Sequence, residues 1–391
     1  MSDVTLNPIL ECVFRSNPAY ELAPFDRLPP DQQALLKDLT NDPDFCGILL
    51  PRAPGTRGIK SVCRNAAGLL QAMARPGPLP SYLLHCRDDG SNRAIAELVL
   101  DGVLEIEHDG RFVSGSEAYP LIYANCPVAE SKGFLPRLSE AALEYAQALA
   151  IDDVARLSAR LYFYNRIPLT ADWSRRLSSE DAVSEFLGIS GQASLKSIHK
   201  NWIPSEPNNG AWFQWQTRRS PLEGRIGNGY KLYVSPQPDA MPAAFRAVVK
   251  ILNDSSAYSF KVGCNAIGLL RPDKLVVYFR EFDSLEQKAR EITLALSGCA
   301  VHGVPFTAAI GDDGLLSWGI DPPFERDALW WQGPESWRLW ITNRLAAALV
   351  SARNNCPGTL QPWQFALGRL RLECIDTNTW APAEGFGLPA A

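Results

Sequence analysis

The chain has 391 residues, of which 46% are hydrophobic, and carries a formal net charge of −5. This length favours two or three domains over a single hydrophobic core, and the mixed charges exclude the basic stripe of a nucleic-acid-binding protein. No stretch reaches the ~18 apolar residues of a membrane helix and no secretory signal opens the chain, so we expect a cytoplasmic protein without a nucleic-acid or membrane partner.

The first third predicts an N-terminal arm over residues 1–44 and a winged-helix-like unit over 45–125. Within this unit a strand begins at Phe45, a helix over 66–74 stops at an Arg-Pro-Gly-Pro breaker, and a second helix covers 94–100. An Asp-Gly turn then joins two short strands as a β-hairpin. Helix, helix and hairpin in this order are typical of a winged-helix unit.

The segment AIAELVLDGVLEIEHDGRFVSG, residues 94–115, resembles winged-helix domains and the PqqD-like elements that bind leader peptides. Reading of DNA is disfavoured, because Arg93 is the only cation of the second helix and Glu97 opposes it. Two interpretations stay open for this unit: a structural module without a ligand, and a peptide-binding module.

Residues 137–198 predict a helical region, with an N-cap around Ser139, helices over 141–150 and 154–164, and a short helix ending at Gly188. The tryptophan-rich stretch that follows, AWFQWQTRR, reads as a strand with aromatic side chains on alternating sides. It is interpreted as a core or edge strand, with the wall of a peptide groove as the alternative.

Residues 199–325 predict an α+β domain, a helix-backed mixed or antiparallel sheet. Strands are expected at 229–235, 258–262 and 274–279, and an amphipathic helix covers 241–252. The strand at 274–279 is almost entirely apolar, which indicates a central position in the sheet. Residues 326–391 are expected to add C-terminal helices and a tail that pack on this domain.

Lys261 interrupts an apolar strand between Phe260 and Val262. A lysine beside a sheet centre loses hydration, which lowers its pKa and allows it to act as a general base. Lys231 lies in the preceding strand and Arg271 in the following loop, so three cations can converge as an anion site, most naturally for phosphate. The alternative is that these lysines lie at strand ends and face solvent.

Three segments, YKLYVSPQPDAMPAAFRAVVKIL, YSFKVG and LLRPDKLVVYF, resemble the phosphothreonine-lyase superfamily over about residues 225–325. This superfamily includes secreted OspF/SpvC-type effectors. The resemblance is closer to the lyase domains and Hop-A-type lyases of class III to V lanthipeptide biosynthesis. The reaction that it implies is β-elimination of phosphate from phosphoserine or phosphothreonine, which leaves a dehydroamino acid.

The resemblance implies a role for each matching residue. Lys261 matches the general-base lysine, while Lys231 and Arg271 match phosphate-binding groups. The effectors carry Lys-x-His where this chain reads Lys231-Leu232-Tyr233, so Tyr233 is expected to replace the histidine as general acid. Arg338 and Arg344 are expected to reach the phosphate pocket, as late arginines do in the family.

The same resemblance implies a ribosomally made precursor peptide as substrate and a separate Ser/Thr kinase as partner, since the sequence has no kinase motifs. A catalytically silent, lyase-like scaffold that binds peptide is the alternative, and a secreted effector is a third hypothesis. The nine cysteines form no CxxC pair and the four histidines show no HxH or HxxxH spacing. We therefore expect no metal and no other cofactor.

Overall fold

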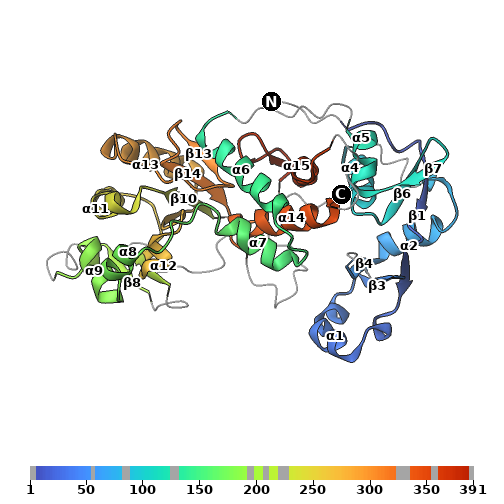
Figure 1. The fold of residues 1–391 in the computed structure, drawn as a ribbon, viewed down its shortest axis with the longest axis horizontal. Helices are drawn as coiled ribbons and strands as arrows, with labels where there is room; N and C mark the ends of the chain where they lie inside the picture. The colour runs from blue at the N-terminus through green and yellow to red at the C-terminus, as the bar shows by residue number, and fades with distance from the viewer. Residues whose placement is uncertain are drawn as a thin grey trace.

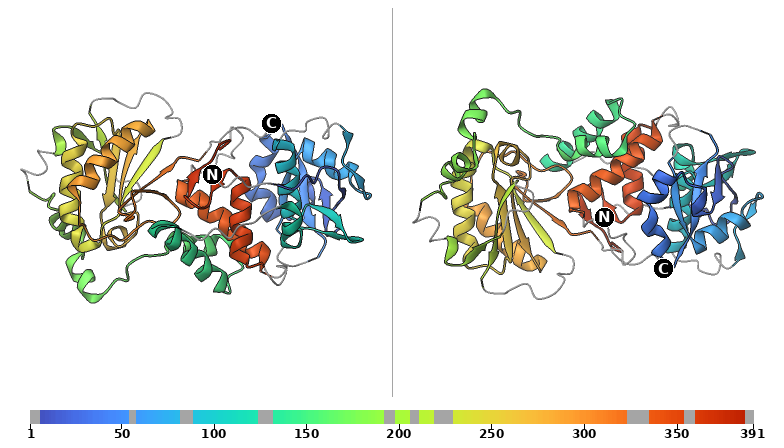
Figure 2. Two further views of the ribbon diagram at one scale, coloured as in Figure 1. Left: turned by 90° about the horizontal axis from the view of Figure 1, so that it is seen from above. Right: turned by 90° about the horizontal axis from the view of Figure 1, so that it is seen from below.

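The computed structural model describes residues 6–53, 58–81, 89–123, 132–191, 198–205, 211–218, 229–322, 335–353 and 360–386. These residues form helices and four antiparallel sheets, which confirms the predicted α+β class. The molecule is elongated: the largest sheet lies at one end, a helical layer lies in the middle, and the N-terminal elements lie at the other end (Figures 1 and 2).

The N-terminal end holds two small sheets. The three-stranded sheet has the order β2 (Tyr20–Ala23), β3 (Phe45–Pro51), β4 (Lys60–Cys63), and the four-stranded sheet has the order β5 (Gly77–Pro78), β1 (Val13–Ser16), β6 (Leu104–His108), β7 (Arg111–Val113). The helices α1 (Pro30–Leu35), α2 (Arg64–Ala72), α4 (Asp89–Leu100) and α5 (Tyr119–Ile122) accompany them. The predicted hairpin is present, but β1 pairs with β6, so part of the predicted arm is a strand of this sheet.

The helical layer contains α6 (Phe134–Ala148), α7 (Val154–Tyr162), α14 (Trp337–Ala352) and α15 (Pro362–Leu372), and α8 (Ala171–Arg176) and α9 (Glu180–Leu187) follow α7 along the chain. The predicted N-cap at Ser139 is wrong, because α6 begins five residues earlier, at Phe134. Ser139 lies inside the helix, donates its Oγ–H to the Leu135 carbonyl at 2.9 Å and accepts from the Phe306 amide at 2.8 Å. Its hydroxyl therefore joins the helical layer to the loop before β13.

The largest sheet has seven strands in the order β13-β14-β10-β12-β11-β9-β8. Their bounds are β8 Trp202–Pro204, β9 Trp212–Thr217, β10 Tyr230–Val234, β11 Ser259–Gly263, β12 Leu275–Phe279, β13 Ala308–Ile310 and β14 Leu316–Ile320. The apolar strand β12 is fourth of the seven, which confirms its predicted central position. Two short strands near the C-terminus, β15 (Ile375–Asp376) and β16 (Ala381–Pro382), form the remaining sheet.

The two faces of this sheet differ because side chains alternate along each strand. Leu232, Phe260 and Val277 lie on one face, in the hydrophobic core with helices α11 (Met241–Leu252) and α13 (Phe282–Ala295). The register pairs Lys231 with Tyr278 and Lys261 with Val276, so both lysines share the other face. This second face is directed toward α7 and α14 (Figure 2).

Gly263, at the end of β11, lies against the short helix α12 (Ala266–Leu269). A Cβ atom on Gly263 would lie 2.4 Å from the Gly268 carbonyl carbon and 2.7 Å from the Leu269 nitrogen. We expect Gly263→Ala to lower the free energy of unfolding by about 1–3 kcal/mol, because two backbones must separate. Urea unfolding measures this change. Gly68→Ala is the control: Gly68 lies in a helix with open space at its Cβ position, so it should gain about 0.5–1 kcal/mol.

Candidate active site

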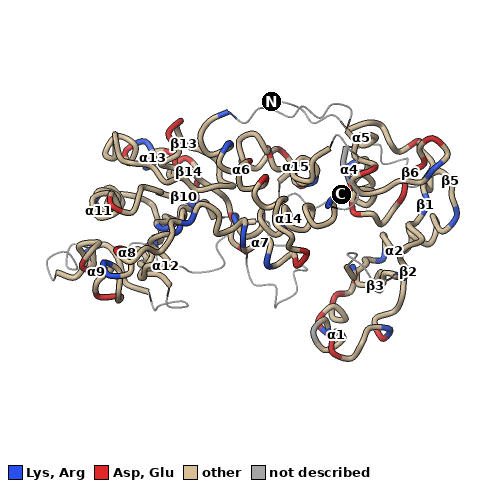
Figure 3. Tube along the Cα trace, in the orientation of Figure 1, with Lys and Arg blue, Asp and Glu red and all other residues tan. Residues whose placement is uncertain are grey.

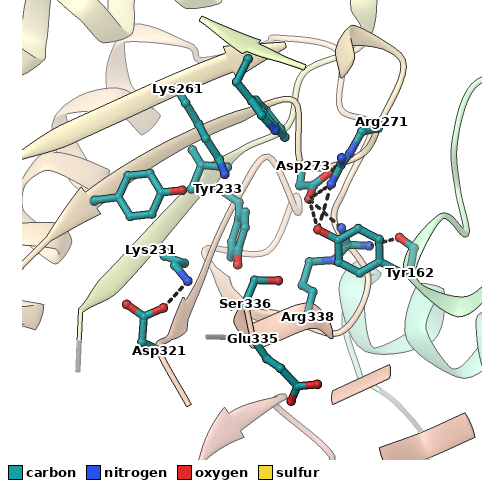
Figure 4. Close-up of a pocket in the computed structure, with 13 residues that line it drawn as sticks. Tyr162, Lys231, Tyr233, Lys261, Arg271, Asp273, Asp321, Glu335, Ser336 and Arg338 are labelled. Carbon is teal, nitrogen blue, oxygen red and sulfur yellow. Dashed lines mark hydrogen bonds and ion pairs between the residues drawn. The ribbon is translucent and has the colours of Figure 1, made fainter. Parts of the chain in front are cut away.

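A pocket of about 390 Å³ lies between the polar face of the seven-stranded sheet, the end of α7 and the start of α14 (Figure 4). Strands β9 to β12 supply its floor, and the loop before β12 supplies one wall. Figure 3 shows several Lys and Arg positions close together between β10 and α12. The lining residues are Tyr162, Trp212, Lys231, Tyr233, Lys261, Arg271, Asp273, Val276, Tyr278, Asp321, Glu335, Ser336 and Arg338.

The structure brings five of the six sequence-predicted site residues into this lining; they are Lys231, Tyr233, Lys261, Arg271 and Arg338. Arg344 is not among the lining residues. Its guanidinium group pairs with Glu373, lies 3.7 Å from the carboxylate of the lining residue Glu335, and stacks over the Trp340 ring. Residues six apart on an α-helix point in different directions, so Arg338 of α14 lines the pocket, whereas Arg344 approaches it only through its pair with Glu335.

Lys261 projects from β11 into the pocket between two aromatic rings. Its Nζ lies 4.4 Å from the Trp212 ring centroid and 5.7 Å from that of Tyr278. Among the described residues, no carboxylate forms an ion pair with it. The pKa of Lys261 is lowered to about 8, mainly by burial; the nearby charges of Lys231 and Arg271 contribute in the same direction, and Asp273 opposes them. A sizeable fraction of this amine is therefore neutral near physiological pH and can accept a proton.

Asp273 fixes the two arginines on the opposite wall. Its carboxylate accepts from Arg271 Nε and Nη2, both at 2.8 Å, and lies 3.0 Å from Arg338 Nη1. Burial by itself would raise the pKa of Asp273, but the two guanidinium groups outweigh burial and hold that pKa well below its ordinary value. The carboxylate is therefore a permanent anion that holds two buried guanidinium groups beside each other.

Tyr162, at the end of α7, completes this wall. Its hydroxyl accepts from Arg271 Nη2 at 2.9 Å and donates to Asp273 Oδ2 at 3.3 Å, and its backbone carbonyl accepts from Arg338 Nη2 at 2.7 Å. Arg271 is also 5.0 Å from the centroid of the Trp212 ring. One aromatic ring, Trp212, thus lies beside both Lys261 and Arg271, so the lysine and the two arginines are near neighbours.

Lys231 lies on the other side of the pocket and is paired with Asp321, the residue that follows β14 (Figure 4). Lys231 is only 8% exposed, whereas the Asp321 side chain is 36% exposed. The pocket is thus lined by four basic side chains, Lys231, Lys261, Arg271 and Arg338, and three acidic ones, Asp273, Asp321 and Glu335.

Tyr233, the predicted general acid, lines the pocket but is 3% exposed. It packs in a small apolar cluster with Val276, Val304 and Tyr278. Burial raises the pKa of Tyr233 well above its ordinary value, and Arg338 offsets this only in part. The phenol is therefore neutral, and its ionised form is strongly disfavoured.

His302, the histidine nearest to the site in sequence, is not among the lining residues. Its Nδ1 lies 2.7 Å from Lys274 Nζ, and its Nε2 faces the carbonyl of Asn165. The pKa of His302 is lowered to about 3, mainly by burial and in part by the charge of Lys274. His302 therefore joins β12 to the end of α7 and supplies no proton to the pocket.

Sequence reasoning missed Asp273, Asp321 and Tyr162. Asp273 stands two residues after Arg271, a spacing that favours local pairing and is a usable signal. Asp321 and Tyr162 carry no such signal, because their partners Lys231 and Arg271 are 90 and 109 residues away. In the described parts of the chain, no three His, Cys, Asp or Glu side chains are grouped as metal ligands, and no helix has the length and apolar character to span a membrane.

No protein-family model and no curated protein sequence matches this chain. Among solved structures, an effector protein from Pseudomonas syringae pv. syringae strain 61 is 12% identical, with a TM-score of 0.37 over 63% of this chain and 98% of that chain. The VirA (SpvC) phosphothreonine lyase effector of Chromobacterium violaceum is 14% identical. Its TM-score is 0.28, and the match covers 37% of this chain and 77% of that chain. The phosphothreonine lyase OspF from Shigella flexneri is 13% identical. Its TM-score is 0.26, and the match covers 47% of this chain and 90% of that chain. Similarities this weak establish no function, which has to be inferred from the pocket itself.

Proposed function

We propose that this chain is a phosphoserine or phosphothreonine lyase, which removes phosphate from a peptide by β-elimination and leaves a dehydroamino acid. One observation carries the proposal: the amine of Lys261, which has no ion-pair partner among the described residues, lies in the same pocket as the paired guanidinium groups of Arg271 and Arg338. An amine with a lowered pKa is suited to abstract a carbon-bound proton. Guanidinium groups are suited to hold a phosphate through several hydrogen bonds.

The proposed reaction uses these groups in one step. The neutral amine of Lys261 removes the α-proton of the phosphorylated residue, and the electrons of that C–H bond form a double bond between Cα and Cβ. The bond between Cβ and the phosphate oxygen breaks, while Arg271 and Arg338 hold the other phosphate oxygens. The departing oxygen takes a proton from the β10 side of the pocket, where Lys231 and Tyr233 lie.

The pH dependence of the reaction follows from the Lys261 amine. Because its pKa is lowered to about 8, the reactive neutral form is a minor species at pH 6 and becomes the major one above pH 8. We expect kcat/KM for a phosphopeptide to rise about tenfold per pH unit below pH 8 and then to level off. Initial rates of phosphate release between pH 5.5 and 9 measure this. A rate that falls across pH 6 to 8 would exclude Lys261 as the base.

We further propose that the substrate is a ribosomally made precursor peptide in lanthipeptide-type maturation and that the chain acts in the cytoplasm. A separate Ser/Thr kinase would supply the phosphorylated residue, because the sequence contains no kinase motifs. The winged-helix-like unit at the N-terminal end would hold the leader of the peptide. The resemblance of the segments around Lys231, Lys261 and Arg271 to lanthipeptide lyases supports this choice of substrate.

The test is mass spectrometry of phosphoserine and phosphothreonine peptides incubated with the full chain, including a precursor peptide once it is identified. Elimination removes the mass of phosphoric acid and leaves an alkene, whereas hydrolysis by a phosphatase would restore the hydroxyl group. As a control, Lys288→Ala removes a lysine that is paired with Glu291 outside the pocket, and it should retain full activity. Unchanged phosphopeptides with the native chain would refute the lyase.

A silent peptide-binding scaffold is the second candidate function. The carboxylates of the pocket favour it. Asp273 already forms ion pairs with Arg271 and Arg338, and Asp321 already forms an ion pair with Lys231. Retained binding of a phosphopeptide, measured by fluorescence anisotropy, together with no loss of phosphate would select this scaffold over the lyase.

A further inference from the structure

Lys231 and Lys261 lie on two sides of one aromatic ring. Lys231 of β10 pairs in register with Tyr278 of β12, and Lys261 lies on β11, on the other side of β12. The Nζ atoms of the two lysines lie 5.9 and 5.7 Å from the Tyr278 ring centroid. A substrate residue held above this ring would therefore have an amine on each side.

The surroundings of the two amines differ in a way that suits opposite roles. Lys231 is paired with Asp321, whereas no carboxylate among the described residues pairs with Lys261. A carboxylate at ion-pair distance favours the charged form of an amine, and burial without such a partner favours the neutral form. Two like groups in environments that separate their protonation states can act as acid and base in the same reaction.

Charge within the pocket also favours Lys231 over Tyr233 as the proton donor. A proton passed from an ammonium group to a departing phosphate neutralises opposite charges in a buried site. A proton passed from the phenol of Tyr233, which is 3% exposed, would leave a new buried anion beside the phosphate. Creating a buried charge is costly, whereas removing a pair of opposite charges is not.

Asp321 is fixed in place at the end of β14. Its backbone amide donates to the Gly229 carbonyl at 2.8 Å. A Cβ atom on Gly229 would lie 3.0 Å from both Asp321 Oδ2 and the Tyr258 hydroxyl, so the glycine leaves room for this carboxylate beside Lys231. The pair therefore has a defined geometry, and Asp321 is a positioning residue rather than a catalytic one.

We propose that the ammonium group of Lys231, held by Asp321, is the general acid that protonates the departing phosphate oxygen; this inference rests on the proposed function. As Lys261 takes the α-proton, the Cβ–O bond breaks and Lys231 gives one proton to the oxygen that leaves. Lys231 ends as a neutral amine and Lys261 as an ammonium group. One proton exchanged with solvent at each lysine restores the starting state.

The first test is Lys231→Arg, because arginine keeps the positive charge and its contacts with phosphate but does not release a proton near neutral pH. We expect kcat for a phosphopeptide to fall by ~10²–10⁴-fold while KM stays within a few-fold. Tyr233→Phe removes the other candidate donor of the same strand, and its kcat should fall by less than ~10-fold if Lys231 is the acid. Thermal unfolding of both variants verifies that they fold.

The second test changes the leaving group. A peptide with β-chloroalanine in place of phosphoserine releases chloride, which needs no proton. Lys231→Arg should therefore eliminate chloride about as fast as the native chain, whereas Lys261→Met should not eliminate it. Asp321→Asn should lower kcat with phosphopeptide and leave KM within a few-fold, because the ammonium group of Lys231 loses the carboxylate that holds it in position. Asp321→Glu should restore part of the activity.

The outcomes separate this inference from the function on which it rests. If the native chain releases no phosphate, both fail. If the native chain is active and Lys231→Arg changes mainly KM, Lys231 only binds phosphate and the inference alone is overturned. If Tyr233→Phe instead loses the ~10² or more in kcat that a general acid supplies, the phenol is the acid.

Discussion

Lys261→Met is expected to lower kcat for elimination by ~10²–10⁴-fold, because the reaction loses the group that removes the α-proton. Methionine has about the length of the lysine side chain and keeps its apolar contacts with Trp212 and Tyr278. Binding of the phosphopeptide should change little, since Arg271 and Arg338 remain on the opposite wall. Quench-flow rates at saturating peptide, together with anisotropy for binding, measure the two quantities separately.

The same variant should not be destabilised, which makes loss of activity interpretable. The pKa of Lys261 in the fold is about 8, below its ordinary value, so the unfolded chain binds more protons and stability rises with pH between about 8 and 10.5. At pH 7 the charged lysine is therefore a cost that methionine removes, and the melting temperature should stay equal or rise. An active Lys261→Met would remove the basis of the lyase proposal.

Asp273→Asn is expected to lower the free energy of unfolding by about 3–5 kcal/mol, because it leaves the guanidinium groups of Arg271 and Arg338 without their common counter-ion. Asp273 and Arg338 are 4% and 1% exposed, so water cannot replace the lost charge. Asparagine keeps the shape of the side chain, which limits the change to charge. Urea unfolding at pH 7, followed by tryptophan fluorescence, measures the difference.

The control for this prediction is Asp239→Asn, which breaks a surface pair with Arg176 at 2.8 Å, in which Asp239 is 74% exposed. Such pairs contribute about 0–1 kcal/mol.

Since the pKa of Asp273 is lowered, its stabilising effect should be complete above about pH 4, the ordinary range of a carboxyl, and be lost only in stronger acid. If Asp273→Asn and Asp239→Asn lowered the free energy of unfolding by the same small amount, Asp273 would not be the residue that holds Arg271 and Arg338 in place.

The sequence by itself determined which strand positions share a face. Alternation along β10 puts Lys231 and Tyr233 on one side, and the unbroken apolar run of β12 indicates the centre of the sheet. It also singled out Lys261, because a lysine between Phe260 and Val262 stands against the pattern of its strand. These signals are local, because the periodicity of a sequence reports only local backbone geometry.

Sequence reasoning failed where the local signal competed with distant contacts. Ser139 has the character of an N-cap, but the tertiary structure extends α6 to Phe134 and gives the hydroxyl partners within the helix and in the loop at Phe306. Arg344 was expected at the phosphate pocket, but helical rotation relative to Arg338 places it beside Glu373.

Only the tertiary structure decided which distant residues face the lysines. Asp321 meets Lys231 across 90 residues because β14 pairs with β10 in the sheet, and Tyr162 meets Arg271 across 109 residues because the end of α7 lies against the sheet face. Periodicity assigns a side chain to a face, but it says nothing about which other segment covers that face. The sequence therefore determines where a buried charged residue lies. The packing of distant segments determines which groups surround it and shift its pKa.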